Sequence, residues 1–338
     1  MVMENVILIT GGAGFIGANF INYYAQKYPD HMIVNADKLT YAAELNNIDV
    51  KTNYQFMHVD LADNNQVNKL FNNYQFTSVF HFAAESHVDN SISGPEAFLK
   101  SNVNGTFYLL QACYEQWMQA PNQAKDGKVN NRFHHISTDE VYGSLIGDGA
   151  FTETTAYAPN SPYSATKAGS DFLVRSYFHT YGLNTVTTNC SNNFGPFQHD
   201  EKLIPVIIRK ALNGEEIPIY GNGKNIRDWL FVKDHCEAIE QVFLKGKSGE
   251  TYNVGGNNEI ENIKLCQMIC GHLDQIRPNE NGKNYSDQIK FVEDRPGHDF
   301  RYAINISKIK SDIGWEPKTQ FQTALNDTIN WYLQKYGK

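Results

Sequence analysis

The sequence predicts an α/β fold in which a doubly wound parallel sheet is followed by a smaller, mixed C-terminal domain. Through the first half of the 338 residues, apolar segments with the length of strands alternate with helical patterns. Several of these segments are apolar on both faces, as in parallel sheets that helices cover on both sides. After about residue 190 the elements become shorter, and Gly and Pro interrupt them in "NNFGPF" and "IPIYGNGKN". This pattern is typical of βαβ units followed by a second domain.

The individual elements follow from the hydrophobic pattern in chain order. Strands are expected at residues 6–9, 32–36, 54–59, 78–82, 133–137 and 185–189, and helices at 15–28 and 96–117 among others. The polar stretch 119–131 is expected to be a surface loop. Acidic residues outnumber basic ones, 37 to 29, and the net charge is -8. Because no long basic run offsets this charge, the composition argues against a protein that binds nucleic acid or a membrane surface.

Location and metal content are also constrained by the sequence. No stretch approaches the roughly 18 consecutive apolar residues of a membrane span, and no basic leader precedes the first strand. The five cysteines, at positions 113, 190, 236, 266 and 270, lack metal-ligand spacing. His134 and His135 are neighbours in a strand and point to opposite faces, so they do not share a metal. We therefore expect a cytoplasmic protein without a metal.

A glycine pattern follows the first predicted strand and opens the first predicted helix. In "ILITGGAGFIG", Gly12, Gly14 and Gly17 form a G-x-G-x-x-G pattern, and Gly11 precedes it. Such glycines let the backbone approach a pyrophosphate, which binds the amides at the helix start. Asp37 ends the second strand, where a carboxylate accepts hydrogen bonds from a ribose and repels a 2'-phosphate. The pattern predicts a Rossmann-type site for NAD rather than NADP.

This motif sets the expected domain boundaries. We expect residues 1–190, plus about 225–248, to form the NAD-binding domain, and residues 191–224 and 249–338 to form the domain that binds the substrate. Asp60, at the end of the third strand, is placed either to reach the adenine or to cap the helix that follows it.

A second motif marks a helix start near residue 161. Ser161 suits the cap position and Pro162 the first turn. Tyr163 and Lys167 are then four residues apart on one face. We expect the ammonium to favour the phenolate, so that Tyr163 accepts a proton well below its ordinary pKa near 10. Next to a nicotinamide, such a phenolate would accept the proton of an alcohol during oxidation.

Two adjacent carboxylates, Asp139 and Glu140, stand in "ISTDEVYG", where the strand 133–137 ends. They are explained either by a solvated turn or by acid–base chemistry. If an alcohol is oxidised to a ketone, the neighbouring carbon-bound proton becomes acidic, and one base and one acid can then eliminate water. Repulsion raises the pKa of one carboxyl and keeps it protonated. Since neighbours in a strand point to opposite faces, the chain must leave strand geometry after Ser137 and enter a helical turn.

The pairing of "TGGAGFIG" with Y-x-x-x-K resembles the extended short-chain dehydrogenase/reductase family, which acts on nucleotide sugars. From about residue 5 to about 335, the chain resembles the 4,6-dehydratase branch of that family in several blocks. These blocks are "FAAESHVDNSI", "HHISTDEVYG", "YAPNSPYSATKAGSD", "TNCSNNFGPF", "EKLIP", "IRDWLFVKDH" and "EDRPGHD". The Thr-Asp-Glu triplet is the most specific, since epimerases of the family usually carry small or hydroxyl residues there.

The resemblance implies loss of water from dTDP-glucose or a related nucleotide sugar, as a step in deoxysugar biosynthesis. Tyr163, helped by Lys167, would remove the proton from the hydroxyl at sugar carbon 4 while NAD takes the hydride, and Thr138 would hydrogen-bond that oxygen. Glu140 would remove the proton at carbon 5. Asp139 would protonate the hydroxyl that leaves carbon 6, and the hydride would return to carbon 6.

The resemblance also implies contacts with both ligands. The expected cofactor contacts are Gly11, Gly14, Phe15, Ile16, Gly17, Asp37, Lys38, Leu39, Thr40, Asp60, Leu61, Phe82, Ala83, Ala84, Ser101, Tyr163, Lys167 and Asn193. The expected substrate contacts are Ser86, His87, Thr138, Asn192, Lys202, Leu203, Pro218, Ile219, Tyr220, Arg227, Asn262, Asp294, Arg295 and His298. Arg227 would hold the diphosphate, unless it pairs with Asp228 or Glu237. Tyr220 would contact the nucleoside, unless it packs in the core.

Other functions stay open at this point. The sequence does not distinguish dTDP-glucose from a sugar with another base, such as UDP-glucose, and a 4-epimerase or an NAD-binding regulator could use the same fold. The Asp139–Glu140 pair argues against the epimerase, and the complete catalytic set argues against the regulator.

A homodimer is expected, because the helices from Glu96 and from Ser161 are apolar and aromatic on more than one side and family members usually pair through them.

Overall fold

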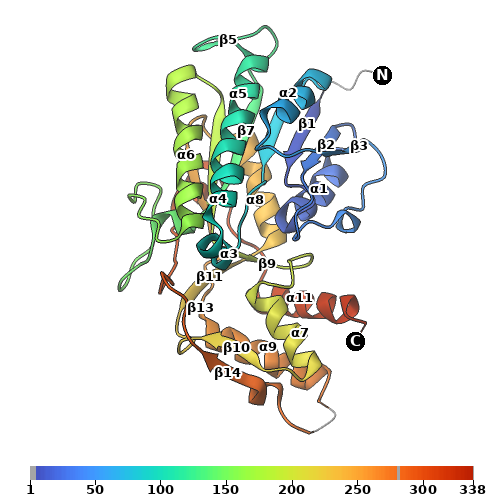
Figure 1. Cartoon of the computed structure of the whole chain (residues 1–338), viewed down its shortest axis with the longest axis vertical. Helices are drawn as coiled ribbons and strands as arrows, with labels where there is room; N and C mark the ends of the chain where they lie inside the picture. The colour runs from blue at the N-terminus through green and yellow to red at the C-terminus, as the bar shows by residue number, and fades with distance from the viewer. Residues whose placement is uncertain (1–4, 280–281, 338) are drawn as a thin grey trace.

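Seven parallel strands form the central sheet of the protein (Figure 1). The structure is a computed structural model that describes residues 5–279 and 282–337. The strands are β1 (Val6–Thr10), β2 (Met32–Asp37), β3 (Tyr54–His58), β4 (Ser78–His81), β7 (Arg132–Thr138), β8 (Thr185–Cys190) and β12 (Thr251–Val254). Their order is β12-β8-β7-β4-β1-β2-β3. The chain direction across the sheet reverses between β1 and β4, which is where ligands bind in doubly wound folds. The predicted fold class is confirmed.

Helices cover both faces of this sheet. On one face lie α1 (Phe15–Lys27) and α8 (Val232–Lys245), and on the other lie α2 (Asn64–Asn73), α5 (Gly105–Trp117) and α6 (Pro162–Tyr181). Successive side chains of β1 therefore pack against different helical layers. Ile7 and Ile9 pack in the hydrophobic cluster that contains α1 and α8, and Leu8 packs in the cluster that contains α2, α5 and α6. Side chains that alternate between two apolar layers explain why these strands are apolar throughout.

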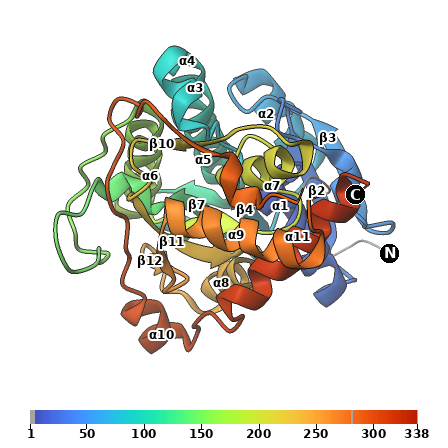
Figure 2. The same cartoon turned by 90° about the horizontal axis from the view of Figure 1, so that it is seen from below.

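The second domain lies at the carboxyl ends of the strands, below the sheet in Figure 1. It contains α7 (Leu203–Asn213), α9 (Asn262–Ile276) and α11 (Phe321–Lys335), with a parallel pair formed by β10 (Ile217–Tyr220) and β14 (Ile289–Val292). Seen from below, α7, α9 and α11 lie in front of the sheet (Figure 2). Between the two parts runs a small sheet, in the order β13 (Glu259–Glu261), β11 (Ile226–Phe231) and β9 (Asn192–Phe194).

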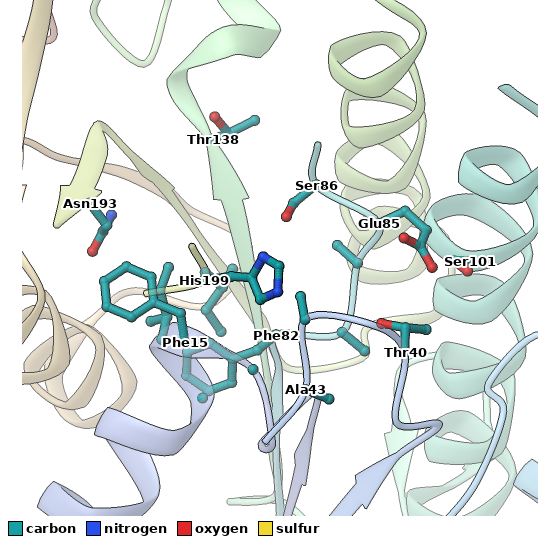
Figure 3. Close-up of a pocket in the computed structure, with 18 of the residues that line it drawn as sticks. Phe15, Thr40, Ala43, Phe82, Glu85, Ser86, Ser101, Thr138, Asn193 and His199 are labelled. Atoms are coloured by element: carbon teal, nitrogen blue, oxygen red, sulfur yellow. The ribbon is translucent and has the colours of Figure 1, made fainter. Parts of the chain in front are cut away.

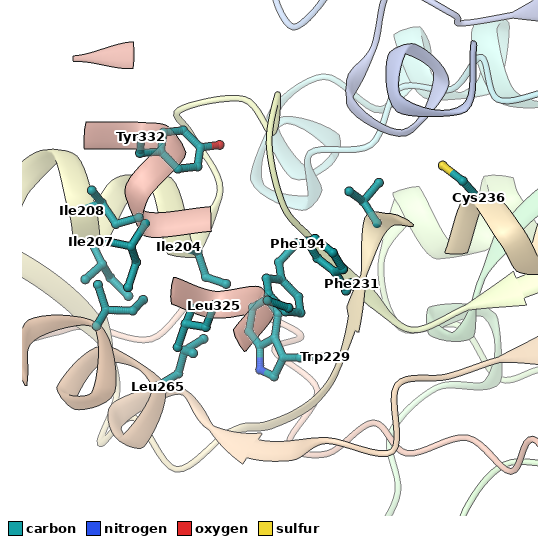
Figure 4. Packing of buried hydrophobic residues seen from close by; sticks show 14 of the residues in the cluster. Phe194, Ile204, Ile207, Ile208, Trp229, Phe231, Cys236, Leu265, Leu325 and Tyr332 are labelled. Carbon is teal, nitrogen blue, oxygen red and sulfur yellow. The ribbon is translucent and has the colours of Figure 1, made fainter. Parts of the chain in front are cut away.

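One hydrophobic cluster joins the two domains. Figure 4 shows Phe194 and Trp229 of the small sheet packed near Leu265 of α9 and Leu325 of α11. Cys236 of α8 belongs to the same cluster. A shared core of this kind fixes the second domain against the carboxyl edge of the sheet.

The structure corrects the expected domain boundary in two places. Residues 251–254 were expected in the second domain, but β12 pairs with β8 and extends the central sheet, and α10 (Ser307–Ile313) packs on β12 and α8. Conversely, β11 opens the segment 225–248 that was expected in the NAD-binding domain, yet it belongs to the small sheet. Both corrections depend on strand pairing between segments that are distant in the sequence. The hydrophobic pattern of a segment does not reveal which strand it pairs with.

Two local elements also differ from expectation. The helix expected at 96–117 consists of α4 (Pro95–Phe98), a π-helical segment (Leu99–Asn104) and α5. π-Helical turns often occur at functional sites, and here the segment contains Ser101. The loop expected at 119–131 contains a short hairpin of β5 (Met118–Ala120) and β6 (Gln123–Ala124). No helix in the described part of the chain is long and apolar enough to cross a membrane.

Candidate active site

A pocket lies at the carboxyl ends of β1, β2, β4, β7 and β8, as Figure 3 shows from close by. Residues that are far apart in the sequence, from Phe15 on α1 to His199 before α7, face the same space. Of the predicted cofactor contacts, all except Leu39 line this pocket. Of the predicted substrate contacts, Ser86, Thr138, Asn192 and Lys202 line it.

The glycine turn has the geometry that a bound pyrophosphate requires. Gly11 has φ +67°, and a Cβ there would lie 2.6 Å from Cα of Ala83. A Cβ on Gly17 would lie 2.3 Å from the carbonyl oxygen of Gly11. Gly14 is the N-cap of α1 and provides no side chain to cap it, so the first amides of the helix are left for an anion. The turn therefore fits a dinucleotide.

Asp37 is fixed at the edge of the pocket by backbone amides. The amides of Ala13 and Leu39 donate to its two carboxylate oxygens at 3.0 and 2.8 Å. Each oxygen keeps a second lone pair for a ribose hydroxyl. The neighbouring ammonium of Lys38 lies 3.2 Å from the Glu85 carboxylate and donates to a second acceptor, the Ser101 hydroxyl, at 2.7 Å.

Asp60 lines the same pocket and does not cap the following helix. The N-cap of α2 is Asp63, whose carboxylate accepts from the amide of Asn65 at 2.9 Å. Asp60 instead accepts from the amide of Ala62 at 2.9 Å. The cap interpretation was therefore wrong, and the adenine contact stays a prediction.

The second motif forms the helix start that the sequence predicted. Ser161 caps α6 in a capping box with Ser164, and the two hydroxyls and amides are paired in both directions. Tyr163 and Lys167 lie one turn apart, are both buried, and line the pocket. The ammonium of Lys167 donates to the carbonyl oxygen of Ile136 at 2.8 Å.

In the chain by itself, the pKa of Tyr163 is shifted upward, opposite to the expected direction. Burial raises the pKa of the Tyr163 phenol well above its ordinary value, and the charge of Glu140 raises it further. A hydrogen bond with Thr138 acts in the opposite direction. Desolvation of the phenolate therefore favours the protonated phenol in the chain by itself.

The Thr-Asp-Glu triplet leaves the strand as the sequence required, one residue later than expected. Strand β7 ends at Thr138, and Asp139–Tyr142 form a 3-10 turn. Thr138 caps this turn by accepting from the amide of Glu140 at 3.3 Å. Thr138 and Glu140 line the pocket. Asp139 is only 1% exposed, which rules out the solvated-turn interpretation for it.

The two carboxyls have different electrostatic surroundings. Burial raises the pKa of Asp139 well above its ordinary value, and the charges of Glu140 and Asp228 add to the effect. Burial also raises the pKa of Glu140, but the positive charges of Arg227, Arg295 and Lys202 oppose it. The arrangement therefore keeps Asp139 protonated more readily than Glu140, as an acid and a base require.

The remaining predicted substrate residues come from the second domain and the loop after β4. Arg295 pairs with Asp89 at 3.0 Å, and the hydroxyl of Tyr220 lies 3.3 Å from the same carboxylate. His298 is hydrogen-bonded to Asp294 at 2.6 Å. These residues, with His87, Leu203, Pro218, Ile219, Arg227 and Asn262, are outside the set that lines the described pocket. Their substrate contacts stay predictions.

The structure has neither of the alternatives considered, which were pairing of Arg227 with Asp228 or Glu237 and packing of Tyr220 in the core. The Arg227 guanidinium donates to the carbonyl oxygens of Ile226, Asp299 and Phe300 and lies 4.3 Å from the ring centre of Tyr302. Tyr220 is 41% exposed, so it is no core residue. Ile219, by contrast, is in the hydrophobic core, so only its backbone can reach a ligand.

Sequence reasoning missed several lining residues. They are Ala36, Ala42, Ala43, Val59, Glu85, Ile136, Ser137, Cys190, Ser191, Gln198, His199 and Glu201. Some lie in the blocks quoted above, but only pairing with a distant residue, such as that of Glu85 with Lys38, identifies their place. Within the described residues, no cluster of three or more His, Cys, Asp or Glu side chains could hold a metal.

Known proteins are similar to this chain in both sequence and fold. The family model described as GDP-mannose 4,6 dehydratase matches residues 8–328. A dTDP-glucose 4,6-dehydratase of Xanthomonas campestris is 54% identical over 329 residues, which cover 96% of this chain and 92% of the relative.

Two solved structures of dTDP-glucose 4,6-dehydratases, both with NAD, superpose on nearly the whole chain. The protein from Streptomyces venezuelae has a TM-score of 0.88 at 39% identity, covering 98% of each chain. The protein from Bacillus anthracis has a TM-score of 0.85 at 40% identity, covering 99% of this chain and 98% of the other. From these similarities in sequence and structure, the chain belongs to the dTDP-glucose 4,6-dehydratase family.

Proposed function

We propose that this protein binds NAD in the pocket and removes water from dTDP-glucose, giving dTDP-4-keto-6-deoxyglucose. The observation that carries the proposal is the pair of carboxyls beside Tyr163. Glu140 lines the pocket with Tyr163 and Lys167, and Asp139 follows Thr138 in the same turn. A 4-epimerase has no need of an acid and a base at neighbouring carbons, whereas elimination of water needs both.

The residues present fit NAD. The glycine turn and the open amides of α1 would hold the pyrophosphate, and Asp37 would hold the adenosine ribose. The pairing of Lys38 with Glu85 leaves no free ammonium beside Asp37 for a 2'-phosphate. When bound, NAD supplies the group that takes a hydride from sugar carbon 4 and returns it to carbon 6.

The side chains of the chain move the protons. Tyr163 takes the proton of the hydroxyl at carbon 4, and Thr138 hydrogen-bonds the same oxygen. Glu140 then removes the proton at carbon 5, since the three cations around it favour its ionised form. Asp139 gives its proton to the hydroxyl that leaves carbon 6, and its raised pKa keeps that proton available. When the hydride reaches carbon 6, Glu140 returns its proton to carbon 5, so that the net change is the loss of one water. The substrate diphosphate would meet the cations Lys202, Arg227 and Arg295.

The test is to incubate the purified protein with dTDP-glucose, UDP-glucose and GDP-mannose, with and without added NAD. Mass spectrometry of the products should show loss of one water from dTDP-glucose. Loss of water only from another nucleotide sugar would contradict the proposed base. A 4-epimer of unchanged mass would contradict the reaction itself.

We further propose a cytoplasmic homodimer. The five cysteines are free and buried, as suits a reducing compartment. Three large apolar side chains are exposed on the helical segments that were expected to pair, namely Leu99 at 51%, Phe107 at 41% and Phe172 at 57%. Large apolar side chains exposed on these segments favour an interface between two copies.

A further inference from the structure

Helix α6 carries a third ionisable side chain on the face of Tyr163 and Lys167. Asp171 follows Lys167 by four residues, as Lys167 follows Tyr163, so the three side chains lie along one face of the helix. Asp171 is only 5% exposed. It is outside the set of described residues that line the pocket. Since burial of a carboxylate is costly unless its charge is compensated, the presence of Asp171 needs an explanation.

One oxygen of the Asp171 carboxylate, Oδ2, accepts a hydrogen bond, and the other, Oδ1, has no hydrogen-bond partner among the described residues. The hydroxyl of Tyr157 donates to Oδ2 at 3.0 Å. Nε2 of His135, on β7, lies 3.1 Å from Oδ1 and also 3.1 Å from Oγ of Ser170. Ser170 already donates its hydroxyl hydrogen to the carbonyl oxygen of Lys167. Both neighbours of Nε2 are therefore acceptors, and Nε2 carries the hydrogen.

Lys167 and Asp171 act on each other through their charges. Burial lowers the pKa of Lys167, and the charge of Asp171 is the largest influence that raises it. Burial raises the pKa of Asp171 to about 6, and the charge of Lys167 is the largest influence that lowers it. Cys190 also favours the ammonium, but burial raises the pKa of its thiol to about 12. At neutral pH, Asp171 is charged and Cys190 is not.

Other titratable groups around this pair carry no compensating charge. Burial lowers the pKa values of His81, on β4, and of His135 well below their ordinary range, so both imidazoles are neutral. Burial raises the pKa values of Tyr142, in the 3-10 turn, and of Tyr157. Burial also raises the pKa of Asp139. Within this interior network, Asp171 is the negative charge that balances Lys167.

We propose that Asp171 is a positioning residue whose negative charge keeps Lys167 protonated inside the protein, and that Tyr163 can take the substrate proton only with that ammonium in place. The kinetic part of this inference rests on the proposed dehydratase function. Without Asp171, the buried ammonium would lose its proton at a lower pH, because desolvation would then be opposed by no full charge in the network.

The first test is the pH profile of kcat for dTDP-glucose. Asp171→Asn keeps the shape of the side chain and removes its charge. A nearby opposite charge typically shifts a pKa by about 1–3 units, so the alkaline limb of the profile should move down by about 1–3 pH units. Above the shifted limb, kcat should fall by a larger factor than KM changes, because Asp171 is not among the residues that line the pocket.

Tyr157→Phe is the matched control. It removes one hydrogen bond of the same carboxylate but leaves its charge, so its alkaline limb should stay where the wild-type limb is. An Asp171→Asn enzyme with the wild-type limb would overturn the inference. So would a Tyr157→Phe enzyme whose limb moves as far as that of Asp171→Asn, since geometry rather than charge would then be responsible.

A second test uses thermal unfolding and needs no substrate. If Asp171→Asn leaves a lone ammonium in the interior, then adding Lys167→Met should raise the Tm above that of Asp171→Asn alone. A double variant that unfolds at the same or a lower temperature would overturn the inference, even if Asp171→Asn is too unstable for kinetics. If the wild-type protein fails to dehydrate dTDP-glucose, the proposed function fails, and this cycle still decides the role of Asp171.

Discussion

Replacing Glu140 with glutamine separates the oxidation of the substrate from the elimination. The amide has nearly the shape of the carboxyl but accepts no proton at neutral pH. Around it, Tyr163, Lys167 and the glycine turn are unchanged. We expect oxidation at carbon 4 to proceed and removal of the carbon 5 proton to stop.

The structure indicates that the first step should even become easier. The charge of Glu140 is the largest electrostatic influence that raises the pKa of Tyr163. Its removal therefore lowers that pKa and favours loss of the phenolic proton. For the second step, a positioned general base is worth about 10²–10⁴ in rate. This corresponds to roughly 2.7–5.5 kcal/mol in the activation free energy, since each tenfold change is about 1.36 kcal/mol.

The assay is rapid mixing of the Glu140→Gln protein with dTDP-glucose, followed through the absorbance and fluorescence of reduced nicotinamide. Turnover should fall by about 10²–10⁴ while the reduced cofactor accumulates. Tyr163→Phe should abolish the signal. Glu316→Gln removes an exposed carboxylate that does not line the pocket and should turn over normally, which controls for loss of charge.

Normal turnover by Glu140→Gln would refute the assignment of the base. If the variant binds substrate without any reduced cofactor, the exchange of the carbon 5 proton with solvent decides the case in a single turnover. Loss of that exchange keeps Glu140 as the base, with an internal equilibrium that hides the intermediate. Exchange at the wild-type rate would instead place Glu140 in the oxidation step.

Three further variants test other parts of the proposal. Asp37→Arg should weaken NAD binding and improve relative use of NADP, and an unchanged preference in a binding titration would exclude a ribose contact. Arg227→Ala should raise KM more than it lowers kcat at alkaline pH. Because Arg227 lowers the pKa of Glu140, its loss should raise that pKa and move the acid limb of kcat to higher pH; an unmoved limb would contradict this coupling. Phe172→Glu should yield a monomer in light scattering, whereas Leu244→Glu, at a side chain that is 53% exposed on α8, should leave a dimer.

The central sheet could be predicted from the sequence because burial on two faces leaves a continuous apolar signal. The strands around Ile7, Ile33 and Phe133 were located within one or two residues of their observed ends. Thr251–Val254 alternates polar and apolar residues, and its membership of the sheet depends on pairing with β8. That pairing is formed between segments more than sixty residues apart, and local pattern contains no information about it.

The motif residues of the site could also be predicted, because their chemistry depends on local spacing. The glycine turn and the Tyr163–Lys167 pair each need only one turn of backbone. The raised pKa of Tyr163 could not be predicted, since it comes from desolvation of the phenolate in the folded protein. The pairing of Lys38 with Glu85 was also missed, as it joins the ends of two different strands.

The separation of acid and base in the Asp139–Glu140 pair comes from the rest of the fold. Two adjacent carboxyls have the same intrinsic chemistry, so only their surroundings can give them different protonation. The charges of Glu140 and Asp228 raise the pKa of buried Asp139, and Arg227 opposes them, whereas Glu140 has three opposing cations, Arg227, Arg295 and Lys202. All three cations come from the segments that follow β8, at the carboxyl edge of the sheet. The part of the protein expected to bind the substrate diphosphate is thus also the part that makes Glu140 the base. Substrate binding and the acid–base pair are therefore coupled. A diphosphate that pairs with these cations would weaken their electrostatic attraction to the Glu140 carboxylate. The pKa of Glu140 would then rise once the substrate is bound, which is when Glu140 must accept the carbon 5 proton.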